Sequence, residues 1–167
     1  MTAEEITKYL TELNDELRLM DIKGEVSLYG GAVMCLAFKS RPVTQDVDAI
    51  FEPVKAIRNA AGKVGKRNNL DIGWLNLAVK MFVVDHPKRI LFDFPNLKIF
   101  VPDGDYMLAM KVLAARLDSA DLEDIQFLLD HLNVTSVEDT IAIVQNYYPN
   151  KEIKGETIFM LKEFLKQ

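Results

Sequence analysis

Apolar and polar positions in the first hundred residues follow a pattern that predicts helices separated by short strands. The sequence Thr2-x-x-Glu5 is a capping box, and apolar residues then recur at helical spacing from Ile6 to Met20. Short apolar runs typical of strands lie at 26–29, 47–51, 90–94 and 97–101. Helices are expected at 32–38, at 53–67 and, from a more ambiguous pattern, at 74–84.

The second part of the chain is expected to contain helices only. A turn sequence at 102–105 precedes them, and Ser136-x-x-Asp139 supports the start of one of them. The expected helices cover 106–117, 122–132, 137–148 and a last segment that ends at 165. This order predicts an α+β fold, in which a small mixed sheet flanked by helices (1–102) is followed by a C-terminal helical region (103–167) packed on it.

Composition is that of a globular protein with a sizeable core, since 49% of the 167 residues are apolar. The single cysteine, Cys35, excludes an intramolecular disulfide and lies in an apolar run typical of a core position. No stretch approaches the roughly 18–20 apolar residues of a membrane span, and the acidic N-terminus does not resemble a secretory signal. We therefore expect a cytoplasmic protein without a membrane partner.

Charge is unevenly distributed along the chain. The net charge of −5 argues against general coating of nucleic acid. Between residues 53 and 70, however, the chain carries five basic residues and no acid: Lys55, Arg58, Lys63, Lys66 and Arg67. A solvated helix face explains such a run when it is taken alone, and the functional alternative is a landing surface for RNA.

Two adjacent glycines, Gly30 and Gly31, lie between a predicted strand and a predicted helix. Glycine lets the backbone approach a ligand closely and makes positive φ available. The helix that follows would present free N–H groups, which bind phosphate. An ordinary tight turn explains the pair equally well when nothing else is considered.

Two aspartates, Asp46 and Asp48, are placed at the start of a predicted strand. Side chains alternate across a strand, so both are expected on the same face. Neighbouring carboxylates repel each other, and Mg²⁺ relieves that repulsion while it also binds phosphate oxygens. The alternatives are a solvated strand edge or a pair of turn caps. The upstream Gly-Gly turn and Thr44, two residues before Asp46, favour the metal site.

The combination Gly30-Gly31 and Thr44-x-Asp46-x-Asp48 resembles the signature of the DNA polymerase beta-type nucleotidyltransferase superfamily. Within that superfamily, the chain resembles small bacterial nucleotidyltransferases related to AbiEii-type toxins of toxin–antitoxin systems. The resemblance spans residues 28–149, and the other segments that carry it are 74–76, 78–80, 108–116, 121–125 and 146–149.

The resemblance implies a site that binds a nucleoside triphosphate together with magnesium or manganese. Gly30 and Gly31 would hold the triphosphate beside Thr44, while Asp46 and Asp48 would bind the cation. It also implies a small mixed sheet of the nucleotidyltransferase type, followed by a helical bundle.

In the helical region, the resemblance implies that Lys111 contacts the nucleotide and that Asp121 or Asp124 orients this lysine or lines the site. Arg116 belongs to the same helical motif and is a further candidate for nucleotide binding. Independently of the resemblance, Lys111 and Arg116 are the only charged residues between 106 and 117, so this helix is expected to be largely buried. A lysine in such a helix extends to water, forms a structural ion pair, or binds a phosphate.

A third carboxylate, which activates the attacking hydroxyl in enzymes of this superfamily, has no obvious place in the sequence. The family pattern commonly has an acid after Trp-Leu-Asn, where this chain has Leu77. Asp93 is the best alternative, because it interrupts an apolar strand-like run.

The resulting functional expectation is a Mg²⁺-dependent nucleotidyltransferase. It would transfer a nucleoside monophosphate to a hydroxyl of a tRNA-like RNA or of a protein, in a toxin–antitoxin setting. The alternative, which Leu77 favours, is a catalytically impaired nucleotide-binding or protein-interaction module on the same fold, such as an antitoxin or regulator with a protein partner.

Overall fold

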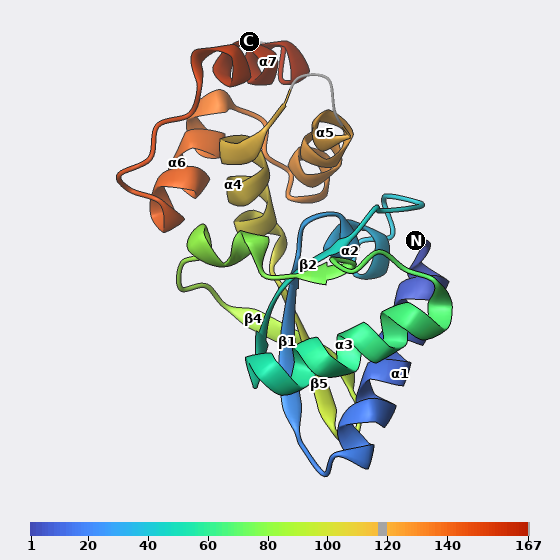
Figure 1. Cartoon of the computed structure of the whole chain (residues 1–167). Helices are drawn as coiled ribbons and strands as arrows, with labels where there is room; N and C mark the ends of the chain where they lie inside the picture. Colours follow the sequence, from blue (N-terminus) through green and yellow to red (C-terminus); the bar gives the residue numbers. More distant parts are fainter. Residues whose placement is uncertain (117–119, 167) are drawn as a thin grey trace. The chain divides into compact units, whose positions relative to one another are not determined.

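The computed structural model describes residues 1–116 and 120–166, which form two compact units (Figure 1). The first unit consists of Met1–Val83 and Lys88–Pro102. The second consists of Val84–Pro87 and Asp103–Gln167. The first unit contains a sheet and the second contains helices, so the α+β fold class expected from the sequence is confirmed.

A five-stranded mixed sheet forms the first unit, in the order β3-β2-β1-β5-β4. Its strands are β1 (Gly24–Tyr29), β2 (Val47–Glu52), β3 (Leu75–Asn76), β4 (Lys88–Asp93) and β5 (Leu97–Pro102). The central strand β1 pairs antiparallel with β2 and parallel with β5. At the edges, β3 is parallel to β2, and β4 is antiparallel to β5.

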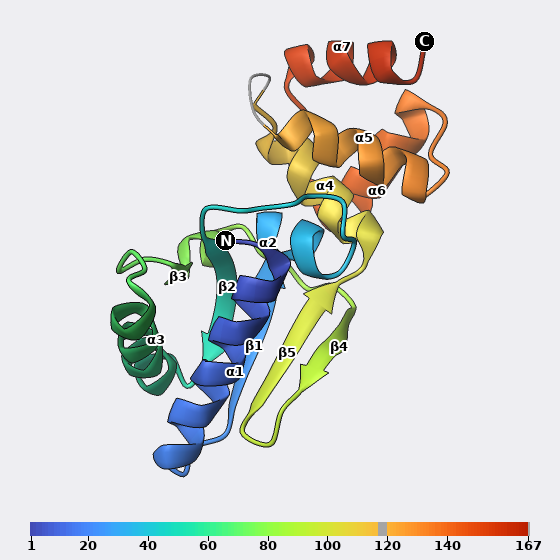
Figure 2. The ribbon, with the colours of Figure 1, turned by 90° about the vertical axis from the view of Figure 1, so that its right-hand side faces the viewer.

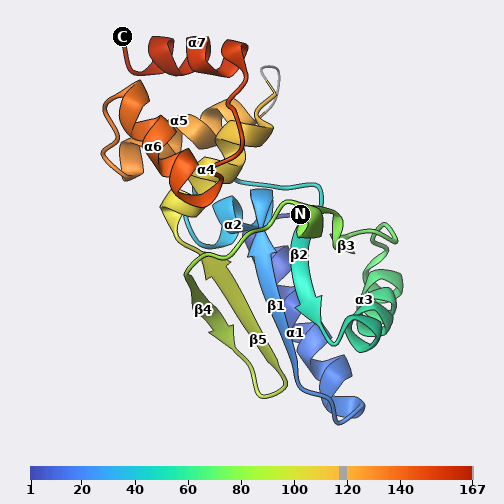
Figure 3. The same cartoon turned by 90° about the vertical axis from the view of Figure 1, so that its left-hand side faces the viewer.

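Helices cover one face of this sheet. Figures 2 and 3 view the sheet from opposite sides, and α1 (Ala3–Leu19) and α3 (Val54–Asn68) lie on the same side of it. Burial along β2 alternates accordingly, since Val47, Ala49 and Phe51 are buried while the residues between them are half-buried. The core of the unit therefore lies between the sheet and the apolar faces of these helices.

The start of α1 follows directly from the sequence, whereas the bounds of α2 differ from the expected ones. Thr2 and Glu5 form the expected capping box at the start of α1, with the Glu5 backbone N–H donating to Thr2 Oγ1 over 3.2 Å. The helix α2 spans Gly30–Leu36, so it begins and ends two residues earlier than expected. Lys39, just beyond it, has a φ of 55°, a left-handed conformation that cannot continue a helix.

The expectation of a helix at 74–84 is wrong. Trp74 is buried at 3% exposure, and its Nε1 donates to the Ala61 carbonyl over 2.9 Å. Its own carbonyl accepts from the Val47 N–H over 2.7 Å, which aligns β3 with β2. This long-range pairing holds the backbone extended against the local preference. Only a short 3₁₀-helix, η1 (Ala78–Met81), follows.

The second unit contains α4 (Gly104–Ala114), α5 (Asp121–His131), α6 (Val137–Tyr147) and α7 (Gly155–Phe164). The first of these helices ends at Ala114, earlier than expected, because the backbone of Ala115 leaves the helical conformation (φ −54°, ψ 133°), and Leu117 lies outside the described residues. Tyr106 is fully buried here, and its hydroxyl lies 2.8 Å from that of Tyr148. The same hydroxyl accepts from the Val84 N–H over 3.1 Å, which ties the segment Val84–Pro87 to this unit. None of the helices in the described part of the chain is long and apolar enough to span a membrane.

Ionic contacts link α3 to α1 in the first unit. Arg67 contacts Glu12 over 2.7 Å and Glu16 over 2.5 Å, and Glu16 is only 7% exposed. Burial alone would raise the pKa of Glu12, but hydrogen bonds from Arg67 and Asn68 outweigh it and lower that pKa below its ordinary value of 4.5. The basic end of α3 thus stabilises the fold by neutralising two acids of α1.

We predict that Arg67→Met lowers the free energy of unfolding by about 1–2 kcal/mol, because it removes the main partner of the buried Glu16 while Arg67 itself is half-exposed. Urea denaturation at pH 7 measures this loss. Arg58→Met, on an exposed position of the same helix, is the matched control and should change stability by less than about 0.5 kcal/mol. Equal effects of the two substitutions would contradict the proposed linkage.

The loss of stability caused by Arg67→Met should also depend on pH. Since the folded-state pKa of Glu12 is lowered, its stabilising contribution is present above pH 4.5 and disappears as the pH falls through the folded-state value. The stability difference between the natural protein and Arg67→Met should therefore shrink below pH 4.5.

Candidate functional site

The turn after β1 and the second aspartate of the motif lie next to each other. Tyr29, the last residue of β1, is directly opposite Asp48 in β2. Gly30 follows with a φ of +63°, and a Cβ atom built on it would lie 2.9 Å from Asp48 Oδ2. The carboxylate of Asp48 thus occupies the space that a side chain at residue 30 would need. The pairing of the first two strands places both features at one end of the sheet.

The second glycine is enclosed by other residues of the same motif. A Cβ on Gly31 would overlap Thr44 Oγ1 and would lie 2.5 Å from Nη1 of Arg41. Thr44 is buried, and its hydroxyl donates to the Asp46 carbonyl over 3.2 Å. The absence of a side chain at Gly31 therefore makes room for Thr44 and Arg41.

The two aspartates occupy the face of β2 that the helices do not cover. Asp46, immediately before the strand, is exposed and Asp48 is half-buried, whereas Val47 between them is fully buried. Asn76 of β3 is paired with Asp48, and its Nδ2 donates to Asp46 Oδ2 over 3.3 Å. Asn76 Oδ1 accepts from the Ala78 N–H over 3.1 Å, which fixes the orientation of the amide.

Sequence reasoning missed two residues of this site, Arg41 and Asn76. Arg41 was recognisable only as the residue before a proline, and nothing local places its side chain on Gly31. Asn76 belongs to the segment that carries the family resemblance, but its position depended on assigning 75–76 to a strand. A polar residue after two apolar ones, in a segment able to pair with β2, was the available signal.

The expectation that Asp93 faces this site is wrong. Asp93 is paired with Lys98, and Lys98 with Glu25, four residues before Tyr29. With about 3.3 Å per residue and about 4.8 Å between strands, Asp93 lies about 13 Å along the strands and about 14 Å across them from Asp48. Its antiparallel strand carries it to the opposite end of the sheet, so it cannot act on a group bound at Asp48.

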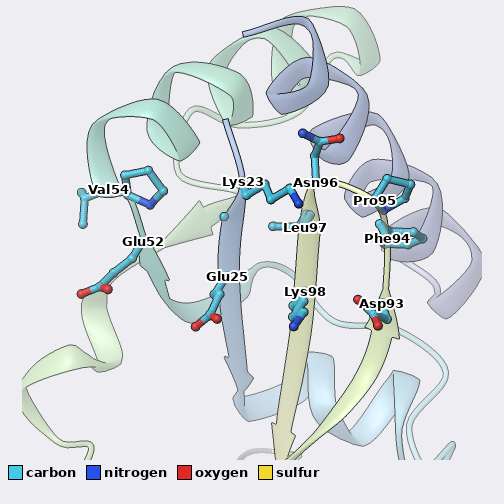
Figure 4. A pocket seen from close by; sticks show the side chains of 12 residues that line it. Lys23, Glu25, Glu52, Val54, Asp93, Phe94, Pro95, Asn96, Leu97 and Lys98 are labelled. Carbon is cyan, nitrogen blue, oxygen red and sulfur yellow. The ribbon is translucent and has the colours of Figure 1, made fainter. Parts of the chain in front are cut away.

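The opposite end of the sheet contains a groove of about 1040 Å³ (Figure 4). Asp93, Glu25 and Glu52 line it together with the basic residues Lys23 and Lys98. Glu25 and Glu52 are directly opposed across two strands. The groove carries charges of both signs and lies well away from the two aspartates of the motif.

The second unit holds a buried ionic cluster around Lys111. Its Nζ lies 2.9 Å from Asp121 Oδ1 and 2.8 Å from Asp124 Oδ2. Lys111 is 9% exposed and Asp124 3%, so this lysine does not extend to water. Of the alternatives considered for Lys111, the geometry shows an ion pair, and both aspartates orient its ammonium group. Arg116, beyond the end of α4, is exposed.

Two residues of the basic run on α3 also take part in contacts within the first unit. Lys63 and Arg67 contact acids of α1, Lys63 at 3.9 Å from Glu16. Lys55, Arg58 and Lys66 are exposed. Lys63 and Arg67 thus also stabilise the fold, within the surface expected to receive RNA.

The donor groups fit a hard divalent cation that shares its coordination with a ligand. Within the described residues, no group of three or more His, Cys, Asp or Glu side chains could enclose a metal ion. Mg²⁺ needs no such group, because one or two carboxylates suffice when phosphate oxygens and water complete the octahedron. Asp46 and Asp48 supply two carboxylates, and Asn76 holds the first of them.

Comparisons with protein-family models, with curated proteins and with solved structures found no match to this chain. The functional inference therefore depends on the chemistry and positions of the residues described above.

We predict that Gly30→Ala lowers the free energy of unfolding by about 1–2 kcal/mol, because alanine is disfavoured at a φ of +63° and its methyl group would displace the Asp48 carboxylate. Gly62→Ala is the matched control, since an added Cβ there meets nothing within 4 Å in the middle of α3. It should raise stability by about 0.5–1 kcal/mol. Thermal unfolding of both variants measures the difference, and a stabilising Gly30→Ala would contradict the described turn.

We predict that Lys111→Met lowers stability by about 3 kcal/mol, because it leaves two carboxylates close together without the ammonium group between them. Lys162→Met, at an exposed position of α7, should change it by less than about 0.5 kcal/mol. Adding Asp124→Leu to Lys111→Met should restore part of the loss, since one buried charge is then removed. A double variant as unstable as the sum of the single ones would contradict the ion-pair account.

Proposed function

We propose that the first unit binds a nucleoside triphosphate with Mg²⁺ or Mn²⁺ and transfers its nucleoside monophosphate to an acceptor hydroxyl. The observation that carries the proposal is the position of the Asp48 carboxylate against Gly30, 2.9 Å from the Cβ position. It brings a potential metal ligand to the turn that the resemblance assigns to the triphosphate. The metal would connect the two, because it binds carboxylate and phosphate oxygens at once.

Asp46 and Asp48 are the residues that would hold the cation. When bound, the cation would neutralise the negative charge that develops on the phosphate oxygens. Asn76 restrains Asp46 through its amide hydrogen bond, so this carboxylate is oriented before any ligand arrives. Preorganisation of this kind favours binding because less side-chain freedom is lost.

The transfer is an in-line displacement at the α-phosphorus. The acceptor oxygen forms a bond to phosphorus, the bond from phosphorus to the bridging oxygen breaks, and pyrophosphate leaves with the electron pair. The proton of the hydroxyl passes to water, because the half-buried Leu77 stands where the family pattern commonly has an acid.

The acceptor is a hydroxyl of a tRNA-like RNA or of a protein, in a toxin–antitoxin setting. The exposed Lys55, Arg58 and Lys66 support RNA, because they form a basic surface on α3. In the second unit, the ion pairs of Lys111 with both aspartates support the orienting role that the resemblance gives to Asp121 or Asp124.

A second candidate function is a nucleotide-binding module without transfer, acting through a protein partner as an antitoxin or regulator. Two observations favour it. β3 places the amide of Asn76 beside Asp48, and Leu77 follows it. An amide holds a carboxylate in place but does not accept a proton at neutral pH.

We predict that Asp48→Asn reduces transfer of label from an NTP at least 100-fold, because it removes one of the two carboxylates that would hold the cation. The protein is incubated with each α-labelled ribonucleoside triphosphate, MgCl₂ or MnCl₂, and total RNA or cell lysate. Asp93→Asn, at the other end of the sheet, is the matched control and should retain full transfer.

Binding measured in parallel separates the candidates. Metal-dependent NTP binding with no transfer by the natural protein supports the second candidate. No NTP binding with either metal contradicts both. Loss of transfer in Asp93→Asn but not in Asp48→Asn would move the site to the other end of the sheet.

A further inference from the structure

We propose that Arg41 is a phosphate-binding residue of this site and that it makes the site prefer nucleoside triphosphates over monophosphates. The inference rests on the proposed function, and it adds a residue and a substrate preference. It starts from the contact of the Arg41 guanidinium with the turn, where Nη1 lies 2.5 Å from the position of a Cβ on Gly31.

The turn places a cation and an anion at neighbouring residues. Asp48 occupies the Cβ position of Gly30, and Arg41 lies against that of Gly31. Consecutive Cα atoms are about 3.8 Å apart. A ligand at this turn therefore meets a carboxylate and a guanidinium within the dimensions of a polyphosphate. A metal-bound phosphate suits the carboxylate, and a further phosphate suits the guanidinium.

The segment that carries Arg41 is held at both ends. Before it, the backbone N–H of Ser40 donates to the Met34 carbonyl over 3.0 Å, at the end of α2. After it, Val43 forms an antiparallel bridge with Thr2. The Thr44 N–H then donates to the Met1 carbonyl over 2.9 Å. These backbone contacts hold the segment that carries the arginine without any ligand, which reduces the entropy lost on binding.

Charge balance favours a phosphate at this guanidinium. Asp46 and Asp48 bring two negative charges, which a divalent cation neutralises. A bound triphosphate then adds more negative charge than the same cation can compensate. The planar guanidinium donates two parallel hydrogen bonds to phosphate oxygens, and a lysine ammonium cannot reproduce this geometry. A monophosphate bound through the cation leaves the arginine without a second phosphate, which explains the expected preference.

The test compares Arg41→Gln and Arg41→Lys with the natural protein. Isothermal titration calorimetry with MgCl₂ gives Kd values for each of the four ribonucleoside triphosphates and for the matching monophosphates. Arg41→Gln should raise the Kd of the triphosphate at least 10-fold and that of the monophosphate less than 2-fold. Arg41→Lys should give an intermediate Kd for the triphosphate, because it keeps the charge and loses the planar geometry. Arg18→Gln, at an exposed position near the end of α1, is the matched control and should change neither Kd.

The outcomes separate this inference from the proposed function. A natural protein that binds no triphosphate overturns both. Natural binding that is unchanged in Arg41→Gln and Arg41→Lys overturns the role of Arg41 alone. Tighter triphosphate binding in Arg41→Gln also overturns it, since the arginine would then block the turn. An equal rise in the Kd values of triphosphates and monophosphates would also overturn it, because Arg41 would then have only a structural role. If Arg41→Gln does not fold, Arg41→Lys provides the same comparison.

Discussion

The antiparallel pairing of β1 with β2 is the constraint on which the candidate site depends. It sets Tyr29 opposite Asp48, so that the chain enters its turn beside a carboxylate. The parallel pairing of β2 with β3 then brings Asn76 next to Asp48 and its amide to Asp46. A shift of either pairing by one residue would turn the polar side chains of that strand into the core. The burial of Val47 and Ala49 opposes such a shift, so hydrophobic packing also fixes the polar site.

The two glycines have a different role from the one that their sequence context suggests. A Gly-Gly turn is expected to leave the backbone open to a ligand. Here the missing side chains make room for Asp48 at Gly30 and for Thr44 and Arg41 at Gly31. A ligand would therefore meet charged side chains held against the turn as well as bare backbone. The motif is a single packed unit, in which the spacing between the glycines and the aspartates serves to bring them into contact.

The sequence allowed prediction of those features that depend on local pattern. The capping box at Thr2, most of the strands and helices, and the shared face of Asp46 and Asp48 follow from spacing alone. The strand at Leu75–Asn76 and the far position of Asp93 depend on which strands pair and in which direction. Two-residue strands carry almost no periodicity, so the local pattern at 74–84 favours a helix, and only the pairing with Val47 defines the strand.

In this site, the residues suited to binding a charged ligand differ from those at the position expected to take a proton from the acceptor hydroxyl. Asp46, Asp48 and Arg41 are charged groups suited to a cation and a polyphosphate, and each is held by contacts within the first unit. Next to Asp48, β3 offers an amide, and the residue that follows is Leu77. An amide can orient a carboxylate and cannot act as a base at neutral pH. Under the proposed function, affinity for a metal-bound nucleotide and the rate of transfer would therefore have different structural origins in this chain.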